Sequence, residues 1–95
     1  MNRTVIWAPS AVRDLKEIFE YIKMDSAERA TKWVETVLSQ AEQLAQFPQM
    51  GRPISELKHP RYRELILGNH RLFHEVKKKE ILIFRVLHSR RLYPE

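Results

Sequence analysis

The sequence predicts an α+β domain in which an antiparallel sheet packs against an N-terminal helical hairpin, with the elements in the order β-α-α-β-β-β. Three observations predict this fold. Residues 9–47 repeat apolar side chains at helical spacing, with a short break in the middle. Residues 62–88 hold three apolar, strand-like runs separated by two short turns. The chain has 95 residues, enough for one core, so we expect a single domain over residues 1–95.

The chain is expected to open with a strand and a helix. The short, β-branched stretch "RTVIW" at residues 3–7 is typical of a strand. Pro9 suits the first position of a helix, because the N–H that proline lacks has no helical partner there. Apolar side chains then recur at helical spacing until the helix ends near Lys23, and Asp14 is expected on the opposite, polar side.

A second helix should follow after a break of only a few residues. Asp25 and Glu28 have the spacing of a capping box, which places the start of this helix at Asp25. Pro48 disfavours helical geometry at the preceding residue and therefore ends the helix. Because the linker is so short, the two helices should lie antiparallel. Trp33 falls in the apolar stripe of the second helix and is expected in the core.

The second half of the chain predicts a loop and three strands. Residues 48–61 contain three prolines and a glycine, which indicates an exposed loop. Strands are expected at 62–67, 70–76 and 81–88. Gly68-Asn69 fits a two-residue hairpin turn with glycine in the first central position.

Strict alternation predicts which side chains share a face of the sheet. In the middle strand, one face should carry Leu72, His74 and Val76. In the last strand, one face should carry Leu82, Phe84, Val86 and His88, and the other Ile81, Ile83, Arg85 and Leu87. The last strand is apolar on both sides, which favours an interior position. The helices can cover only one face, so the other is expected to stay partly open and to carry arginines and histidines.

Charge is distributed unevenly along the chain. Residues 1–51 hold 6 basic and 7 acidic groups, whereas residues 52–95 hold 11 basic and 5 acidic groups. The second half therefore favours an anionic partner, either nucleic acid or an acidic protein. The chain has no cysteine, which excludes disulfides and thiolate metal sites. It shows no signal-peptide pattern and no apolar run long enough for a bilayer, so we expect a cytoplasmic protein without metal or cofactor.

The stretch "MGRPISELKHPRYRELILGNHRLFHEV", followed by "ILIFRVLHSRR", resembles the ParE/RelE superfamily of toxins from type II toxin–antitoxin modules. The resemblance covers nearly the whole chain, including the helical hairpin. The residues that carry it form four groups in a fixed order: Gly51-Arg52 with Glu56, Arg63-Glu64, Gly68-Asn69-His70-Arg71, and Val86-Leu87-His88-Ser89-Arg90-Arg91.

This resemblance implies a growth-arresting toxin and a cognate antitoxin that is acidic and partly disordered. ParE-type members act on DNA gyrase and have no established hydrolytic site, whereas RelE-type and YoeB-type members cut mRNA in the ribosome. The "VLHSRR" ending is closer to the ParE form. RelE toxins carry two lysines at positions that are Tyr62 and Glu64 here. A non-hydrolytic gyrase inhibitor is therefore the expectation, a metal-independent endoribonuclease is the alternative, and an inert descendant that only binds an antitoxin is a third possibility.

The resemblance also implies candidate site residues. For a ribonuclease, the catalytic candidates are Arg71 on the phosphate, His88 as the acid and Glu56 as the base. For target binding, the candidates are Arg63, Arg71, Arg90 and Arg91. Antiparallel pairing of the last two strands is expected to bring Arg71 and His88 together, with Arg90 and Arg91 following in a cluster of like charge.

Several of these residues also have a structural interpretation. Arg71 could form a cross-strand ion pair with Glu64 or Glu75. His74, between two apolar neighbours, is expected to be a buried residue with a hydrogen-bond partner. Lys77–Lys79 are expected to be a solvated hairpin tip.

Overall fold

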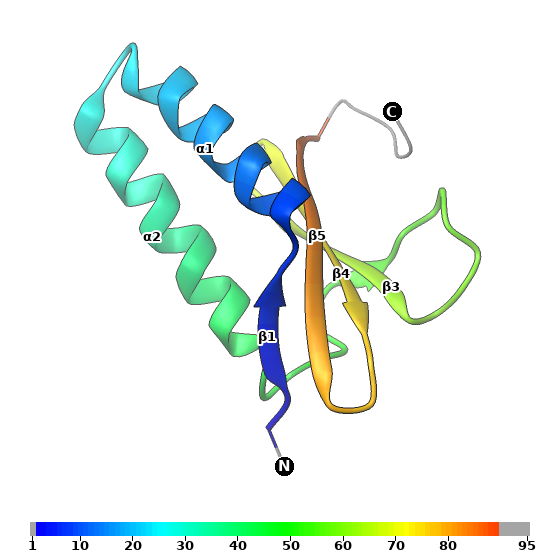
Figure 1. The fold of residues 1–95 in the computed structure, drawn as a ribbon. Helices are drawn as coiled ribbons and strands as arrows, with labels where there is room; N and C mark the ends of the chain where they lie inside the picture. Colours follow the sequence, from blue (N-terminus) through cyan, green and yellow to red (C-terminus); the bar gives the residue numbers. More distant parts are fainter. Residues whose placement is uncertain (1, 90–95) are drawn as a thin grey trace.

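In the computed structural model, which describes residues 2–89, a helical hairpin lies against one face of a five-stranded sheet (Figure 1). The expected α+β class and the order of the predicted elements are confirmed. One short strand, β2, was not expected, because it lies inside the proline-rich segment. The elements are β1 (Thr4–Trp7), α1 (Pro9–Lys23), α2 (Ala27–Gln43), β2 (Arg52–Pro53), β3 (Tyr62–Leu67), β4 (His70–Val76) and β5 (Glu80–His88).

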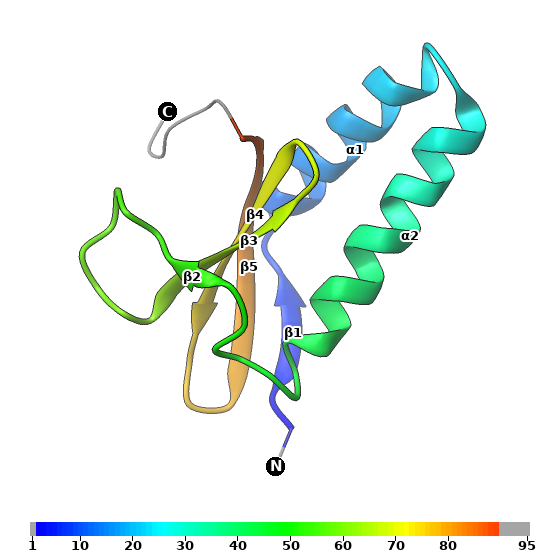
Figure 2. The ribbon, with the colours of Figure 1, turned by 180° about the vertical axis from the view of Figure 1, so that it is seen from behind.

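The sheet is mixed, whereas the sequence predicted an antiparallel one. Its strand order is β1-β5-β4-β3-β2. The four later strands pair antiparallel, but β1 runs parallel to β5, with Thr4 beside Glu80 and Trp7 beside Ile83. Between β1 and β5 the chain reverses direction an even number of times, so both strands point the same way (Figure 2). β5 lies between β1 and β4 in this order, so it has neighbours on both sides, as its apolar character predicted.

The two helices start where short-range chemistry allows. Pro9 is the first residue of α1, as expected. The N-cap of α2 is Ser26 and not Asp25, because the extended Ser26 turns its hydroxyl towards the N–H of Arg29 at 3.2 Å. Asp25 instead forms a surface ion pair with the Arg29 side chain. The last α-helical residue of α2 is Gln43, and turns lead from there to the proline-rich segment.

The turn between β3 and β4 is the expected two-residue hairpin. Gly68 adopts a φ of 63°, whereas Asn69 has a negative φ, so glycine occupies the one position that needs a left-handed backbone. Leu67 therefore pairs directly with His70, and this register fixes the faces of both strands.

A β-bulge overturns the face assignment predicted for β5. The β4–β5 pairing shifts so that Phe73 lies beside Arg85 while His74 lies beside Ile83, which leaves Phe84 as an extra residue. The alternation therefore changes phase halfway along β5. The residues of β5 on the face towards the helices are Ile81, Ile83, Val86 and His88.

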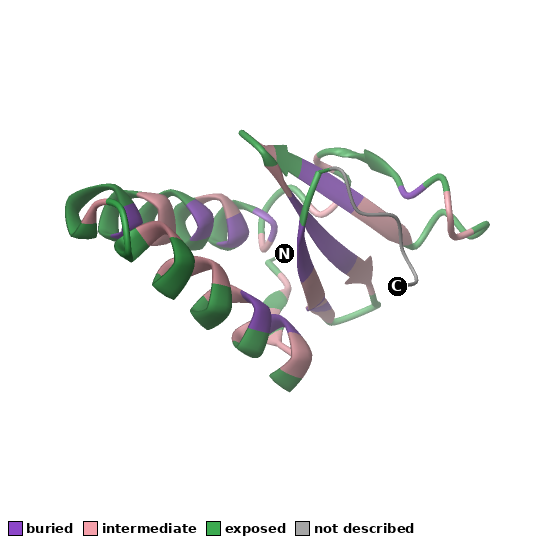
Figure 3. Cartoon of the chain, turned by 90° about the horizontal axis from the view of Figure 1, so that it is seen from above, coloured by how far each residue is buried: buried purple, intermediate pink, exposed green. Residues whose placement is uncertain are grey.

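The sheet separates two apolar clusters of unequal size, and Figure 3 shows the burial along the strands. The face towards α1 and α2, here called the helix face, holds the main core. The opposite face was expected to be partly open. It is partly covered by residues 54–57, because Ile54 is only 1% exposed and packs against Phe73 and Leu87. We call this side the loop face.

The edge of β5 beyond the end of β1 is covered by side chains of α1. The Ser10 hydroxyl donates to the carbonyl of Phe84 at 2.7 Å. The carboxylate of Asp14 accepts the N–H of Val86 at 2.9 Å and the Nε–H of Arg85 at 2.7 Å. The prediction that Asp14 lies on the polar side of its helix was therefore wrong, since this carboxylate is buried and partnered.

Candidate functional site

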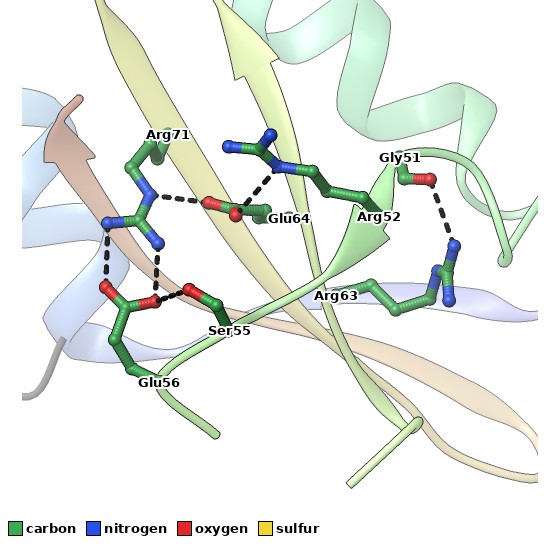
Figure 4. A network of polar contacts seen from close by, with 7 residues as sticks. All are labelled: Gly51, Arg52, Ser55, Glu56, Arg63, Glu64 and Arg71. Atoms are coloured by element: carbon green, nitrogen blue, oxygen red, sulfur yellow. Dashed lines mark hydrogen bonds and ion pairs between the residues drawn. The ribbon is translucent and has the colours of Figure 1, made fainter. Parts of the chain in front are cut away.

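The buried Arg71 lies at the centre of an ion-pair network on the loop face (Figure 4). Its Nε donates to Glu64 at 2.5 Å, and its two terminal nitrogens donate to the two oxygens of Glu56 at 3.0 and 2.9 Å. Arg52 donates to the second oxygen of Glu64 at 3.1 Å. Arg71 is only 5% exposed and Glu64 only 2% exposed. We call Arg52, Glu56, Glu64 and Arg71 the Arg71 network.

Strand register brings the members of this network together. Arg52 of β2 pairs directly with Glu64 of β3. Arg71 of β4 pairs with Ile66, so Glu64 is its diagonal neighbour on the same face. Glu56 arrives from the loop after β2, which Ile54 anchors in the smaller apolar cluster.

Glycine is required where that loop approaches the sheet. Gly51 has a φ of 88°, and a Cβ at this position would lie 2.1 Å from the carbonyl oxygen of Glu64. No side chain fits in that space, so only glycine lets the chain enter β2 this close to β3. The placement of Glu56 over Arg71 therefore depends on Gly51 as well as on the apolar anchor.

The network compensates the charge of Arg71 within the protein. The hydrogen bonds that Arg71 donates to Glu56, supported by the one that it donates to Glu64, raise the pKa of the Arg71 guanidinium despite its burial. The predicted pairing of Arg71 with Glu64 is confirmed, whereas Glu75 pairs with Arg61 at 3.4 Å. The guanidinium of Arg71 also lies over the Phe73 ring, 4.6 Å from its centroid. A phosphate would have to displace two carboxylates to reach Arg71.

Two other residues singled out from the sequence also have structural partners, on the helix face. Arg63 donates to the carbonyl of Gly51 at 3.0 Å. His74 is fully buried, and its Nε2 lies 3.1 Å from the carbonyl of Pro48, in agreement with the predicted structural role. Burial lowers the pKa of His74 to about 4, the Pro48 carbonyl opposes this change, and nearby Arg63 lowers the pKa further.

His88 lies at the other end of the sheet, beside His70. The two histidines are direct cross-strand partners with ring centroids 5.6 Å apart, and the His70 ring is 5.1 Å from that of Trp33 on α2. The Ser89 N–H donates to the Asn69 carbonyl at 2.7 Å, which closes the strand end next to this pair. Burial, together with nearby His88, lowers the pKa of His70.

A groove of about 680 Å³ opens at this end, between the helical hairpin and the β3–β4 turn. We call it the helical groove. Trp33 packs against the main core, as predicted, and also lines the groove. Tyr21 lies on its rim and is 76% exposed. The lining residues used below are Ile18, Tyr21, Trp33, His70 and His88.

Arg71 and His88 do not form the cluster that the sequence predicted. Arg71 pairs with Leu87 on the loop face, whereas His88 pairs with His70 on the helix face. Neighbouring residues of a strand point to opposite faces, so two strand ends can meet while these side chains diverge. Arg90 and Arg91 lie outside the described residues. A base, a phosphate-binding cation and an acid must surround one phosphate, but Glu56 and Arg71 are separated from His88 by the sheet.

Sequence reasoning missed three contributors to these sites. Arg52 was named only as part of the family resemblance, although the preceding glycine signals a close backbone approach. Asp14 was placed on a polar helix side, and no local pattern reveals its contact with β5. His70 was noted only as part of a motif, and its pairing with His88 depends on the bulge at Phe84, which no local pattern reveals.

The described residues contain no group of three or more His, Asp or Glu side chains placed to hold a metal ion. Within that same part of the chain, no helix combines the length and the apolar character needed to cross a membrane.

Comparison with known proteins gives a consistent result. The sequence matches the family described as "ParE toxin of type II toxin-antitoxin system, parDE" over residues 5–93. The search of curated protein sequences gave no match. Among solved structures, the chain is similar to one from the chromosomal ParDE toxin–antitoxin system of P. aeruginosa, with 28% identity and a TM-score of 0.74, covering 90% of this chain and 95% of that one.

Two more distant structures share the fold. One comes from the RelBE2 toxin–antitoxin complex of Mycobacterium tuberculosis, with 22% identity, a TM-score of 0.66 and coverage of 93% of this chain and 99% of that one. The other comes from the E. coli DinJ-YafQ toxin–antitoxin complex, with 12% identity, a TM-score of 0.63 and coverage of 98% and 99%.

Proposed function

The chain belongs to the ParE toxin family of type II toxin–antitoxin systems, whose sequence profile spans residues 5–93, and from this premise we propose that it arrests growth by inhibiting DNA gyrase. The family match over nearly the whole chain is the observation that carries the proposal. Gyrase acts on chromosomal DNA, so we place the activity in the cytoplasm.

The Arg71 network supports inhibition without hydrolysis. A ribonuclease of this fold would use Arg71 as a cation on the scissile phosphate, but here two carboxylates compensate its charge. Glu56, the candidate base, is held by both terminal nitrogens of Arg71 and by the Ser55 hydroxyl. These three donors occupy most of its roughly four lone-pair sites, which makes it a poor acceptor for a 2′-hydroxyl proton. His88, the candidate acid, lies on the other face.

Different roles follow for the candidate residues. We assign Arg71 and Glu56 a positioning role, because they hold the loop after β2 on the sheet. We assign target binding to His88, which is exposed at the end of β5, and to Arg63, Arg90 and Arg91. The last two follow His88 directly in the sequence, although they lie outside the described residues.

The partner that neutralises the toxin is a cognate antitoxin. The similar solved structures come from toxin–antitoxin systems, two of them determined as complexes. We propose that the helical hairpin and the basic sheet bind an acidic, partly disordered antitoxin, which places an amphipathic helix in the helical groove. The groove offers Trp33 and Ile18 as apolar contacts and His70 and His88 as polar ones.

Purified gyrase tests the target. The chain should inhibit DNA supercoiling and increase the amount of cleaved plasmid, whereas mRNA on purified ribosomes should remain intact. Cleaved mRNA together with unaffected supercoiling would move the function to the endoribonuclease alternative. His88→Ala should be compared with the wild type in both assays, because it changes the exposed end of β5 without altering the Arg71 network. If His88 contacts the target, this variant should lose the activity that the wild type shows.

Growth tests the toxin assignment itself. Induction of this chain alone should arrest growth, and co-expression of its antitoxin should restore it. Normal growth with abundant folded protein would indicate an inert descendant. Tyr21→Ala should keep the toxicity but weaken the rescue, because Tyr21 lies on the groove rim and contributes nothing to the core clusters.

A further inference from the structure

Five cations from three distant parts of the sequence meet at the end of the sheet opposite the helical groove. Figures 1 and 2 show the β4–β5 turn at this end, with the start of β1 on one side of it and the start of β3 on the other. We call the set the basic pole; it consists of Arg3, Arg61, Lys77, Lys78 and Lys79.

Hydrogen bonds tie these segments to one another. The Nε of Arg3 donates to the carbonyl of Lys77 at 2.8 Å, and the N–H of Thr4 donates to the carbonyl of Lys79 at 3.1 Å. On the other side, the N–H of Val76 donates to the carbonyl of Arg61 at 2.7 Å. The lysine turn is therefore flanked by an arginine from each neighbouring segment.

The charges of the pole exceed those of its acidic neighbours. All three lysines and Arg61 are exposed. Glu75 partly offsets Arg61 at 3.4 Å, and Glu80 ends the turn. The Arg61 guanidinium also lies 5.0 Å from the centre of the Tyr62 ring, which orients it. From sequence alone the three lysines are a solvated tip. The two arginines that the fold adds make a compact cationic surface, and like charges gathered in this way raise the affinity for a polyanion.

We propose that the basic pole binds the phosphate backbone of duplex DNA. The inference rests on the proposed function, because gyrase presents DNA beside any protein that binds it. The β4–β5 turn lies at the opposite end of the sheet from the β3–β4 turn (Figure 1), which borders the helical groove, so the pole leaves the groove accessible. Charged lysines on a turn contact phosphates without reading bases, so binding should be independent of sequence and sensitive to salt.

The test compares two triple variants with the same net charge. Lys77→Gln, Lys78→Gln and Lys79→Gln remove three charges from the pole. Lys16→Gln, Lys23→Gln and Lys32→Gln remove three charges from exposed positions of the helical hairpin. Binding of the purified chain to a short fluorescent DNA duplex is measured without gyrase at several salt concentrations, with thermal melting as the folding control.

The pole variant should lose affinity, and the slope of log K against log [salt] should become shallower by about 2.7, since each phosphate contact contributes about 0.9. The hairpin variant should keep the wild-type slope. Equal losses in the two variants would assign binding to overall charge and overturn the proposal, as would unchanged binding by the pole variant or a preference for single-stranded RNA.

Gyrase inhibition by the same proteins separates the two proposals. A wild-type chain that binds DNA through the pole but leaves supercoiling unaffected would refute the gyrase target alone. If the wild-type chain inhibits gyrase and the pole variant binds DNA normally, only the proposal that the basic pole binds DNA would be refuted.

Discussion

The loop face and the helical groove both hold charged or titratable side chains, but these side chains are buried and paired on the loop face and accessible in the groove. On the loop face, Arg71 and Glu64 are buried and mutually compensated. In the helical groove, His70 and His88 lie side by side on a surface that is open to a partner. The family resemblance marks residues of both regions as functional, yet Glu56, Glu64 and Arg71 are paired with one another on the loop face, whereas His88 in the groove is exposed.

This difference separates residues that hold the fold from residues that contact a partner. A buried ion pair is costly to break, because the remaining charge has lost its hydration. Replacing an exposed residue usually changes stability little. Substitutions on the loop face should therefore act through unfolding, and those in the groove should act through binding. The predictions below run from the largest expected effect to the smallest.

Gly51→Ala should be the most damaging change. The new Cβ would lie 2.1 Å from the carbonyl of Glu64, at a φ that disfavours alanine. We expect a loss of about 4 kcal/mol in unfolding free energy, from steric overlap and backbone strain together. Urea denaturation measures it. Gly68→Ala is the control at the groove end, where the φ is also positive but nothing lies within 4 Å, and it should cost only about 1–2 kcal/mol. Similar losses at both glycines would show that the close approach of β2 contributes nothing.

Glu64→Ala should destabilise the protein by about 3 kcal/mol, because the buried guanidinium of Arg71 would lose a carboxylate partner and Arg52 would lose the same carboxylate. Glu75→Ala is the matched control, since it removes an equivalent carboxylate whose partner Arg61 is exposed, and it should cost under about 1 kcal/mol. Chemical denaturation of both variants provides the comparison.

Arg71→Ala should lose toxicity because the protein unfolds. A stable but inactive Arg71→Ala protein would therefore contradict the positioning role.

His74 makes stability depend on pH. Its pKa of about 4 in the folded chain is below the usual value for histidine, so the unfolded chain binds the proton more readily. The stability that neutral, buried His74 contributes to the folded chain is therefore present above pH 6.5 and is lost as the pH falls towards 4. Between about pH 7 and pH 5 the wild type should lose about 2 kcal/mol relative to His74→Gln, as followed by denaturant unfolding. Parallel pH profiles for the two proteins would mean that His74 binds its proton equally well in the folded and the unfolded chain, and would contradict the lowered pKa.

His88→Ala should change the unfolding free energy by less than about 0.5 kcal/mol, because the side chain is exposed at a strand end. Growth arrest on induction should nevertheless be lost, since we place His88 at the target surface. Melting temperature is the folding control. Full toxicity of this variant would remove the groove end from the target-binding surface.

Local patterns predicted most of the fold. Helical periodicity identified α1 and α2, and Gly68-Asn69 identified the β3–β4 turn and its register. The features of the fold that were not predicted depend on contacts between segments that are distant in the sequence. The parallel pairing of β1 with β5 joins residues at opposite ends of the chain, and the bulge at Phe84 has no glycine or proline to mark it.

The candidate site was predicted as a set of residues but not as an arrangement. Arg71, Glu56 and Glu64 were named, and one of the two carboxylate partners of Arg71 was foreseen. The separation of Arg71 from His88 follows from pairing His70 with His88, and this pairing needs the exact register of β4 and β5. A shift of one residue reverses every side chain, so an inference from strand ends alone could not assign the faces.

The parallel β1–β5 ladder also sets the order in which this toxin becomes active. Thr4 pairs with Glu80, so β1, which is synthesised first, can join the sheet only after β5 has been synthesised. The contacts between α1 and α2 are local in sequence and form early, whereas the long-range pairing of β1 with β5 is slow. During translation, the nascent chain therefore presents its hairpin before it has a complete sheet. An antitoxin that binds the hairpin can meet its toxin on the ribosome, before the toxin can act.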